Sequence, residues 1–279
     1  MKTNRLYSYV IILAIALWHM PAWGNGYNLQ IGGTEVTSDN YANISAASGF
    51  SAVQKGMVSY DHASNTLTLN NATIKASKDV SAIKMFAAGK PFIIKLVGHN
   101  ILETSGTGDA VSTFFCSLRL TGDGTLEASA NLAITSGNYL TLDGGCTIEV
   151  EAPIWASQTI VINDAKVHAK AKVGEPALSA FGGIELRSGS YVADPEGATC
   201  EQWNHKARNG KAYVYLKDGK PCDDVLIKRG KNTGIENAAT PPPTKEDVIY
   251  TLDGVRMKLP FERLPKGVYI VNGKKVKKE

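Results

Sequence analysis

The feature that most constrains the fold is an apolar repeat in the middle of the chain. An apolar-x-apolar pair, a turn and another apolar residue recur six times, with successive pairs 20 to 27 residues apart. This period is typical of one coil of a solenoid, in which each coil buries its apolar face only against its neighbours. The pairs end at Leu69, Leu96, Leu120, Leu142, Ile162 and Leu186, and the residues after the turns are Ile74, Ile101, Leu126, Ile148, Val167 and Tyr191.

The turns of the repeat and a second recurring element define each coil. Every turn contains Gly, Asn or Asp, which tolerate a positive φ angle, as in Asn70-Asn71 and Gly122-Asp123-Gly124. Each copy can therefore bend at the same corner. The second element falls between consecutive copies and indicates about three short strands per coil. It comprises Ala82-Ile83, Ala110-Val111, Ala133-Ile134, Pro153-Ile154 and Ala177-Leu178.

We predict an all-β protein: a right-handed parallel β-helix of about six rungs, with end caps and a small C-terminal β domain. Val, Ile, Thr and Gly fill the repeat and no helical period is sustained, so long helices are not expected. A β-sandwich would not keep one strand-corner-strand pattern through successive copies, and a leucine-rich repeat needs a fixed Asn or Cys that is not visible. The β-helix with its N-terminal cap is assigned to 25–194 and the C-terminal cap to 195–232.

The first 24 residues have the pattern of a secretory signal peptide. Lys2 and Arg5 precede the apolar run Val10–Trp18, and the small residues Ala22 and Gly24 fit a cleavage site. Nine apolar residues at ~1.5 Å each cannot cross a hydrocarbon core of ~30 Å. We therefore expect a secreted protein, in the periplasm or on the outer cell surface, with no membrane span in the mature chain.

The charge is concentrated at the two ends of the chain. The formal net charge is +4, but residues 25–244 carry −2, because Lys2, Arg5 and the basic segment 245–279 supply the excess. No concentrated basic face is visible, so nucleic acid is not an expected partner.

Four cysteines remain in a chain expected to be exported, where disulfides are permitted. Cys200 and Cys222 flank an aromatic stretch and are a candidate disulfide. Cys116 and Cys146 share the alternation of their apolar neighbours, so we expect buried thiols. The histidines show no metal-ligand spacing with these cysteines.

A linker and a small β segment follow the repeats. Residues 233–247 contain three consecutive prolines, which favour an extended spacer. Residues 248–279 contain two apolar runs, each ending in a hairpin signal, Asp253-Gly254 and Asn272-Gly273. About 30 residues of β structure bury little area alone, so a recognition role is expected.

Two resemblances follow from these residues. The runs Ile249–Arg256 and Leu264–Val276 resemble the C-terminal sorting domain of Bacteroidetes type IX (Por) secretion, which implies surface delivery and recognition by the secretion machinery. Within residues 27–230, Tyr27–Gly33 and Asn65–Ile74 are similar to secreted right-handed β-helix proteins classed as carbohydrate-binding domains. That resemblance implies attachment to acidic or plant-type polysaccharide, with calcium in some members and no other cofactor.

Candidate site residues come from strand charges and from aromatics. Lys166, His168 and Lys170 form a basic strand that would meet uronates, and Tyr139 and Trp155 are the expected exposed sugar-stacking rings. The aromatic strip from which the last two are chosen comprises Phe86, Phe114, Phe115, Tyr139, Trp155 and Phe181.

The acidic residues indicate no catalytic pair. Asp123, Asp143 and Asp164 lie at different offsets after their apolar pairs, so turn formation explains them. Asp223 and Asp224 are interpreted as a solvated pair. A non-catalytic carbohydrate-binding protein is the leading hypothesis. A polysaccharide lyase or glycoside hydrolase of the same fold and a structural or adhesive surface protein are the alternatives.

Overall fold

The computed structural model describes residues 26–47, 49–86, 89–205, 210–230, 249–252, 256–257, 261, 264–272 and 274–278. The expected signal peptide and linker lie outside these residues. The chain divides into two compact units, Met1–Asn232 and Thr233–Glu279. Strands make up 60% of the structure and helices 3%, and no helix in the described part is long and apolar enough to cross a membrane.

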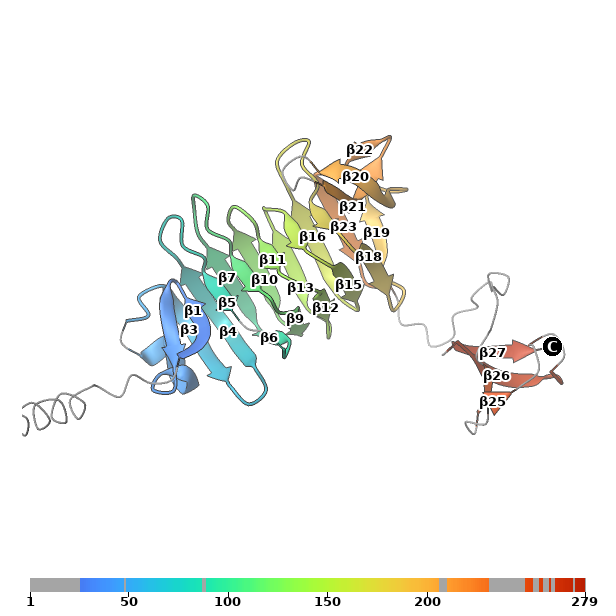
Figure 1. Ribbon diagram of the computed structural model, residues 1–279, viewed down its shortest axis with the longest axis horizontal. Helices are drawn as coiled ribbons and strands as arrows, with labels where there is room; N and C mark the ends of the chain where they lie inside the picture. Colours follow the sequence, from blue (N-terminus) through green and yellow to red (C-terminus); the bar gives the residue numbers. More distant parts are fainter. Residues whose placement is uncertain are drawn as a thin grey trace, which may run out of the picture. The chain divides into compact units, whose positions relative to one another are not determined.

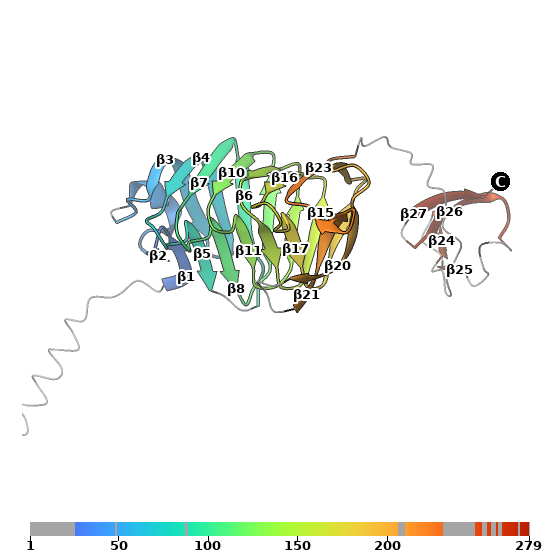
Figure 2. The ribbon, with the colours of Figure 1, turned by 90° about the horizontal axis from the view of Figure 1, so that it is seen from above.

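The first unit is a parallel β-solenoid of about five turns, so the predicted β-helix is confirmed. Each turn contributes one strand to each of three ladders, which the chain visits in the same order (Figure 1). The first ladder begins at the second recurring sequence element and runs along the lower side in Figure 2. It contains β5 (Ile83–Phe86), β8 (Val111–Phe114), β11 (Ile134–Ser136), β14 (Ile154–Ala156) and β17 (Leu178–Ala180).

The second and third ladders share the long strand β4 (Thr66–Lys75), whose first half pairs with β6 and whose second half pairs with β7. The second ladder continues with β6 (Phe92–Val97), β9 (Leu118–Gly122), β12 (Leu140–Asp143), β15 (Thr159–Asn163) and β18 (Gly183–Arg187). The third continues with β7 (His99–Glu103), β10 (Thr125–Ser129), β13 (Thr147–Val150) and β16 (Lys166–Lys170).

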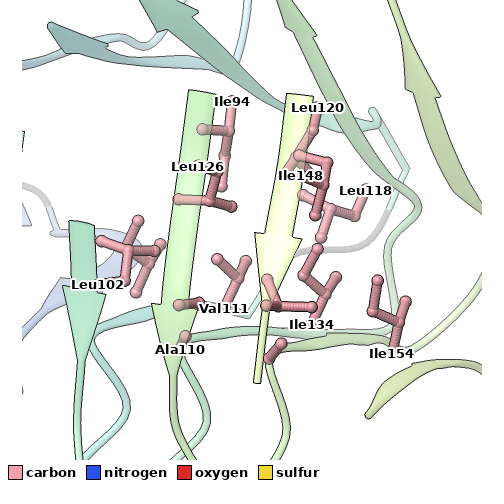
Figure 3. Packing of buried hydrophobic residues seen from close by; sticks show 14 of the residues in the cluster. Ile94, Leu102, Ala110, Val111, Leu118, Leu120, Leu126, Ile134, Ile148 and Ile154 are labelled. Atoms are coloured by element: carbon pink, nitrogen blue, oxygen red, sulfur yellow. The ribbon is translucent and has the colours of Figure 1, made fainter. Parts of the chain in front are cut away.

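Inward apolar side chains from the three ladders form one core, shown from close by in Figure 3. Ile94, Leu120 and Leu142 are fully buried, as are Ile148 and Ile134. Side chains alternate between the two faces of a strand, so every second residue of each strand points into this core. Each buried Leu or Ile stabilises the fold by roughly 1.5–3 kcal/mol.

The register differs from the expected one at the second turn. Ile94 pairs with Leu120, whereas Leu96 lies beside Gly122. β6 carries three inward apolar residues in alternation, and a pattern of period two does not distinguish registers that differ by two residues. In the next strand, the inward positions are Asn100 and Leu102, so Ile101 was wrongly predicted as the apolar anchor.

Asn100 is a fully buried polar residue within the apolar column. Its side-chain oxygen accepts a hydrogen bond of 2.9 Å from the backbone N–H of Ala72, in the preceding turn. Its side-chain nitrogen donates to the carbonyl oxygens of Val97 at 3.2 Å and Thr125 at 3.3 Å. The amide thereby ties three successive turns together at the corner between the second and third ladders.

The corners use positive φ as expected. Asn71, Gly122 and Asp164 have φ angles of 50°, 109° and 57° at the same corner of different turns. A Cβ atom at Gly122 would also meet the carbonyl oxygen of Leu96. Gly124 was expected to need positive φ as well, but it is required for a different reason, since a Cβ there would meet the carbonyl oxygen of Gly98.

Antiparallel strands cap both ends of the solenoid. Tyr191 belongs to the C-terminal cap, where β19 pairs antiparallel with β23, so the sixth repeat does not complete a parallel turn. The N-terminal cap contains β1 (Gly26–Ile31), β2 (Thr34–Thr37), the 3-10 helix η1 (Tyr41–Ala46) and β3 (Val53–Asp61). The C-terminal cap contains β19 (Tyr191–Asp194), β20 (Thr199–His205), β21 (Gly210–Lys217), β22 (Lys220–Pro221) and β23 (Asp224–Lys228).

The second unit contains a small antiparallel sheet, in the order β25-β24-β26-β27. Ile249, Leu264 and Tyr269 form its buried cluster. The strands are β24 (Ile249–Thr251), β25 (Arg256–Met257), β26 (Gly267–Val271) and β27 (Lys274–Lys278).

Replacing either corner glycine with valine tests the fold. Gly122→Val places a branched side chain at positive φ, and Gly124→Val pushes a Cβ into backbone. We expect each to lose about 1–3 kcal/mol of unfolding free energy. Thr141→Ser is the control, since Thr141 lies between the buried Leu140 and Leu142 and points outward. Equal melting temperatures for the control and the glycine variants would contradict the register.

Asn100→Leu tests the buried amide. Leucine matches the apolar residues at the same inward position of the following turns. It leaves the Ala72 N–H and the Thr125 carbonyl without their side-chain partner. We expect a loss of about 1–3 kcal/mol, measured by urea unfolding. The same change at the exposed Asn131 should alter stability by less than about 0.5 kcal/mol. A variant at least as stable as the parent would show that the amide is dispensable.

Candidate functional site

The outer surface of the third ladder carries charged side chains in register. Because Leu126 and Ile148 point inward, their neighbours Glu127 and Glu149 point outward, and these two pair on adjacent strands. The same outward column continues with Ile101 on one side and His168 on the other. A column across four strands extends for about 14 Å at ~4.8 Å per strand.

These side chains line a groove of about 380 Å³, which we call the charged groove. Its floor crosses β7, β10, β13 and β16 and therefore runs along the solenoid axis. Its charged lining residues are Glu103, Glu127, Glu149, Glu151, His168 and Lys170.

Three of the four glutamates of the charged groove pair with basic side chains that lie outside it. Glu127 pairs with His99 at 2.8 Å, and Glu103 pairs with Lys75 at 2.8 Å. Lys166 donates a hydrogen bond of 2.7 Å to Glu149 and holds the pKa of that carboxyl below its ordinary value. Exposed pairs of this kind stabilise a fold by only about 0–1 kcal/mol each, so their main effect is to fix side-chain position.

The basic strand predicted from the sequence is present but is not a free cationic surface. Lys166, His168 and Lys170 all lie on β16 and all pair with carboxylates. Asp224 of the C-terminal cap lies 2.8 Å from Nε2 of His168 and 3.8 Å from Nζ of Lys170. The interpretation of Asp224 as merely solvated was therefore wrong, because β23 pairs with β16 and brings it there.

A second surface lies where the first ladder gives way to the second. Phe86 and Phe114 stack with ring centroids 4.7 Å apart and planes at 12°, and Nζ of Lys84 lies 4.8 Å from the Phe86 centroid. We call this surface the aromatic edge. Its exposed rings are Phe86, Phe114, Phe115, Tyr139 and Phe181.

Phe115 is the most exposed ring of the aromatic edge. Its exposed fraction is 78%, and its φ angle is 62°, in the left-handed region that bulky residues avoid. The backbone of the next turn fits closely against it, since a Cβ at Gly137 would lie 2.8 Å from its nitrogen. Such strain costs about 1–3 kcal/mol and persists only where the surroundings enforce it.

Trp155 was expected to be exposed, and this prediction was wrong. Only 6% of it is exposed, because β21 and β20 continue the sheet of the first ladder beyond β17, and Ala212 and Val214 of β21 pack against the indole. The Phe181 ring lies perpendicular to the indole, with the ring centroids 4.6 Å apart. Tyr139 is exposed as predicted. Of the five candidate residues, His168 and Lys170 line the charged groove and Lys166 lies beside it. Tyr139 belongs to the aromatic edge, and Trp155 is buried in the cluster with Ala212 and Val214.

The glutamates of the groove were missed, although the sequence contains their signal. Thr125-Leu126-Glu127 and Thr147-Ile148-Glu149 are the same tripeptide pattern one coil apart. The acidic residues weighed as a catalytic pair from the sequence lie at the corners, whereas the in-register pair of glutamates lies within the strands.

All four cysteines are free thiols in the structure. Cys116 and Cys146 are buried as predicted, and burial raises the pKa of Cys146 to about 12. The Cys200–Cys222 disulfide therefore has no support here and stays a prediction. Within the described residues, no group of three or more His, Cys, Asp or Glu side chains is placed to hold a metal ion. The expectation of calcium also stays a prediction.

Comparison with protein-family models, with curated proteins and with solved structures finds no match to this chain.

Thiol titration checks the cysteine assignment. Because the thiolate is the reactive form, Cys146 should not react in the folded protein at pH 8, nor should the buried Cys116. In guanidinium without reductant, four reactive thiols would match the structure and contradict the disulfide predicted from the sequence. A count of two under those conditions would instead show that Cys200 and Cys222 are joined.

Proposed function

We propose that this protein is an exported, non-catalytic polysaccharide-binding protein whose charged groove holds a neutral polysaccharide chain. One observation carries the proposal: five of the six charged side chains lining the groove are held by partners outside it. Carboxylates fixed in this way present acceptor oxygens to sugar hydroxyls, which donate hydrogen bonds. Groups that are already ordered lose less conformational entropy when a ligand binds.

The charge balance favours a neutral polymer over an acidic one. The groove and its partners contain five carboxylates against three lysines, so even two protonated histidines would only equalise the charges. A polyuronate would meet no positive excess there. The proposal thus differs from the acidic polysaccharide that the family resemblance implies. The residues counted are Glu103, Glu127, Glu149, Glu151, Asp224, Lys75, Lys166, Lys170, His99 and His168.

Hydrolysis is the alternative that neighbouring carboxylates raise. Glu127 and Glu149 lie on adjacent strands, and retaining glycosidases place two carboxyls ~5–5.5 Å apart. Their general acid needs a raised pKa. Lys166 lowers the pKa of Glu149, and Nε2 of His99 lies 2.8 Å from a carboxylate oxygen of Glu127. This pairing supports binding rather than proton donation.

The place of action follows from the ends of the sequence. The signal-peptide pattern and the sorting-domain resemblance support export to the cell surface, where long polysaccharides are present. The second unit would then serve recognition by the secretion machinery, while the solenoid binds the glycan.

A retention assay tests the proposal. The mature chain is run through gels containing xyloglucan, mixed-linkage β-glucan or galactomannan, and through gels containing polygalacturonate or alginate, in calcium and in EDTA. We expect retention by at least one neutral polymer and no release of reducing ends. Glu127→Gln with Glu149→Gln should weaken this retention at least tenfold, about 1.4 kcal/mol.

The matched control is Glu185→Gln, which removes a carboxylate paired with Arg187 on the second ladder. It should leave retention unchanged. If none of the neutral polymers slowed the migration of the protein, the proposal would be refuted. Retention by the acidic polymers alone would refute it too.

A further inference from the structure

The charged groove and the aromatic edge lie on opposite sides of the solenoid core. The groove is on the third ladder, whereas the edge lies at the corner between the first and second ladders. In a coil of three sides, that corner faces the third side across the interior. The interior is filled by the apolar columns, so no passage joins the two surfaces.

The aromatic edge exposes apolar side chains, which form no hydrogen bonds with water. Four of the chain's seven phenylalanines lie there, and a phenyl ring has no polar atom that solvent could satisfy. Each exposed ring loses roughly 25 cal/mol of hydrophobic stabilisation for every Å² of apolar surface that stays in contact with water. The four are Phe86, Phe114, Phe115 and Phe181.

The backbone at Phe115 strengthens this observation. The other described non-glycine residues with positive φ are Asn, Asp and Ser, which tolerate that conformation. Phe115 is the one bulky residue among them, and it has the largest exposed fraction of the edge. A strained backbone that holds an apolar ring in solvent points to a ligand for that ring.

The chemistry of the edge favours a sugar over a protein or a lipid surface. Polar side chains lie among the rings: the exposed Gln158 and the half-buried Ser157 follow β14 at the same corner. A continuous apolar partner would cover these two side chains without offering them hydrogen bonds. A pyranose has an apolar C–H face that fits a phenyl ring and hydroxyls around its rim that fit the polar groups between the rings.

We infer that the solenoid bridges two polysaccharide chains, one in the charged groove and one stacked on the aromatic edge. This inference rests on the proposed function of the groove. Both surfaces extend along the solenoid axis, because each turn of the solenoid adds one strand to the ladder beneath them. The apolar core separates the two surfaces. Two sites that cannot be filled by one stretch of polymer make a monomer bivalent, so it links chains and gains avidity.

Stoichiometry and light scattering test the inference on the mature chain. With oligosaccharides of the neutral polymer that retains the protein, calorimetry should give two sites per chain. Soluble polymer mixed with the protein should scatter more light as chains are linked. The groove variant, Glu127→Gln with Glu149→Gln, and an edge variant, Phe114→Ser with Phe115→Asn, should each keep one site and lose the scattering increase.

The controls separate bridging from misfolding and from self-association. Asparagine tolerates positive φ, which offsets part of the stacking with Phe86 that is lost at Phe114, so the edge variant should still unfold in one cooperative transition. Met57→Ser, which removes an exposed apolar side chain from β3, should bridge like the parent. Sedimentation without polysaccharide should give a monomer. A dimer would overturn the inference.

The outcomes distinguish the two proposals. If the parent binds no neutral polymer, the proposed function fails and the bridging inference fails with it. If the parent binds with one site per chain, or the edge variant still increases scattering, bridging is refuted and the groove proposal stands.

Discussion

The stacking of successive turns is the constraint on which the rest of the structure depends. A strand in any of the three ladders finds hydrogen-bond partners only in the turns before and after it, and the same neighbours bury its apolar face. Both requirements must be met in one register, so the corners have to approach closely. This explains why Gly122 and Gly124 lie against the backbone of the preceding turn, and why the one polar residue in the column, Asn100, is fully hydrogen-bonded.

Because the coils stack in register, outward side chains that repeat along the sequence also lie side by side on the surface. Once the inward positions are in register, the outward positions are too, so Glu127 lies beside Glu149 and Phe86 beside Phe114. The groove and the edge are both products of this geometry. Each surface thus has one pair of like side chains on adjacent strands, which are ~4.8 Å apart along the axis.

Local signals predicted most of the solenoid. The period, the three strands per turn and the corner residues are all properties of one coil, and they were read from short stretches. The errors involve contacts between distant segments. Trp155 is buried by a hairpin that begins more than 40 residues later, and Asp224 reaches His168 from 56 residues away. The shift at Ile94 arises because alternation alone does not choose between registers two residues apart.

The carboxylates of the third ladder explain why the predicted basic strand is not a free basic patch. Two like charges about 4 Å apart repel by roughly 1 kcal/mol in water and by about 4 kcal/mol near a protein surface. The in-register pair Glu127 and Glu149 would therefore strain the stack without a partner for each carboxylate. Lys166 supplies a cation beside Glu149, and His99 lies 2.8 Å from Glu127. Lys166, which the sequence suggested as a sugar ligand, pairs with Glu149, one of the carboxylates that face the groove. Since exposed ion pairs return little stability, the main effect of these pairs is to fix the positions of the carboxylate oxygens that face the groove.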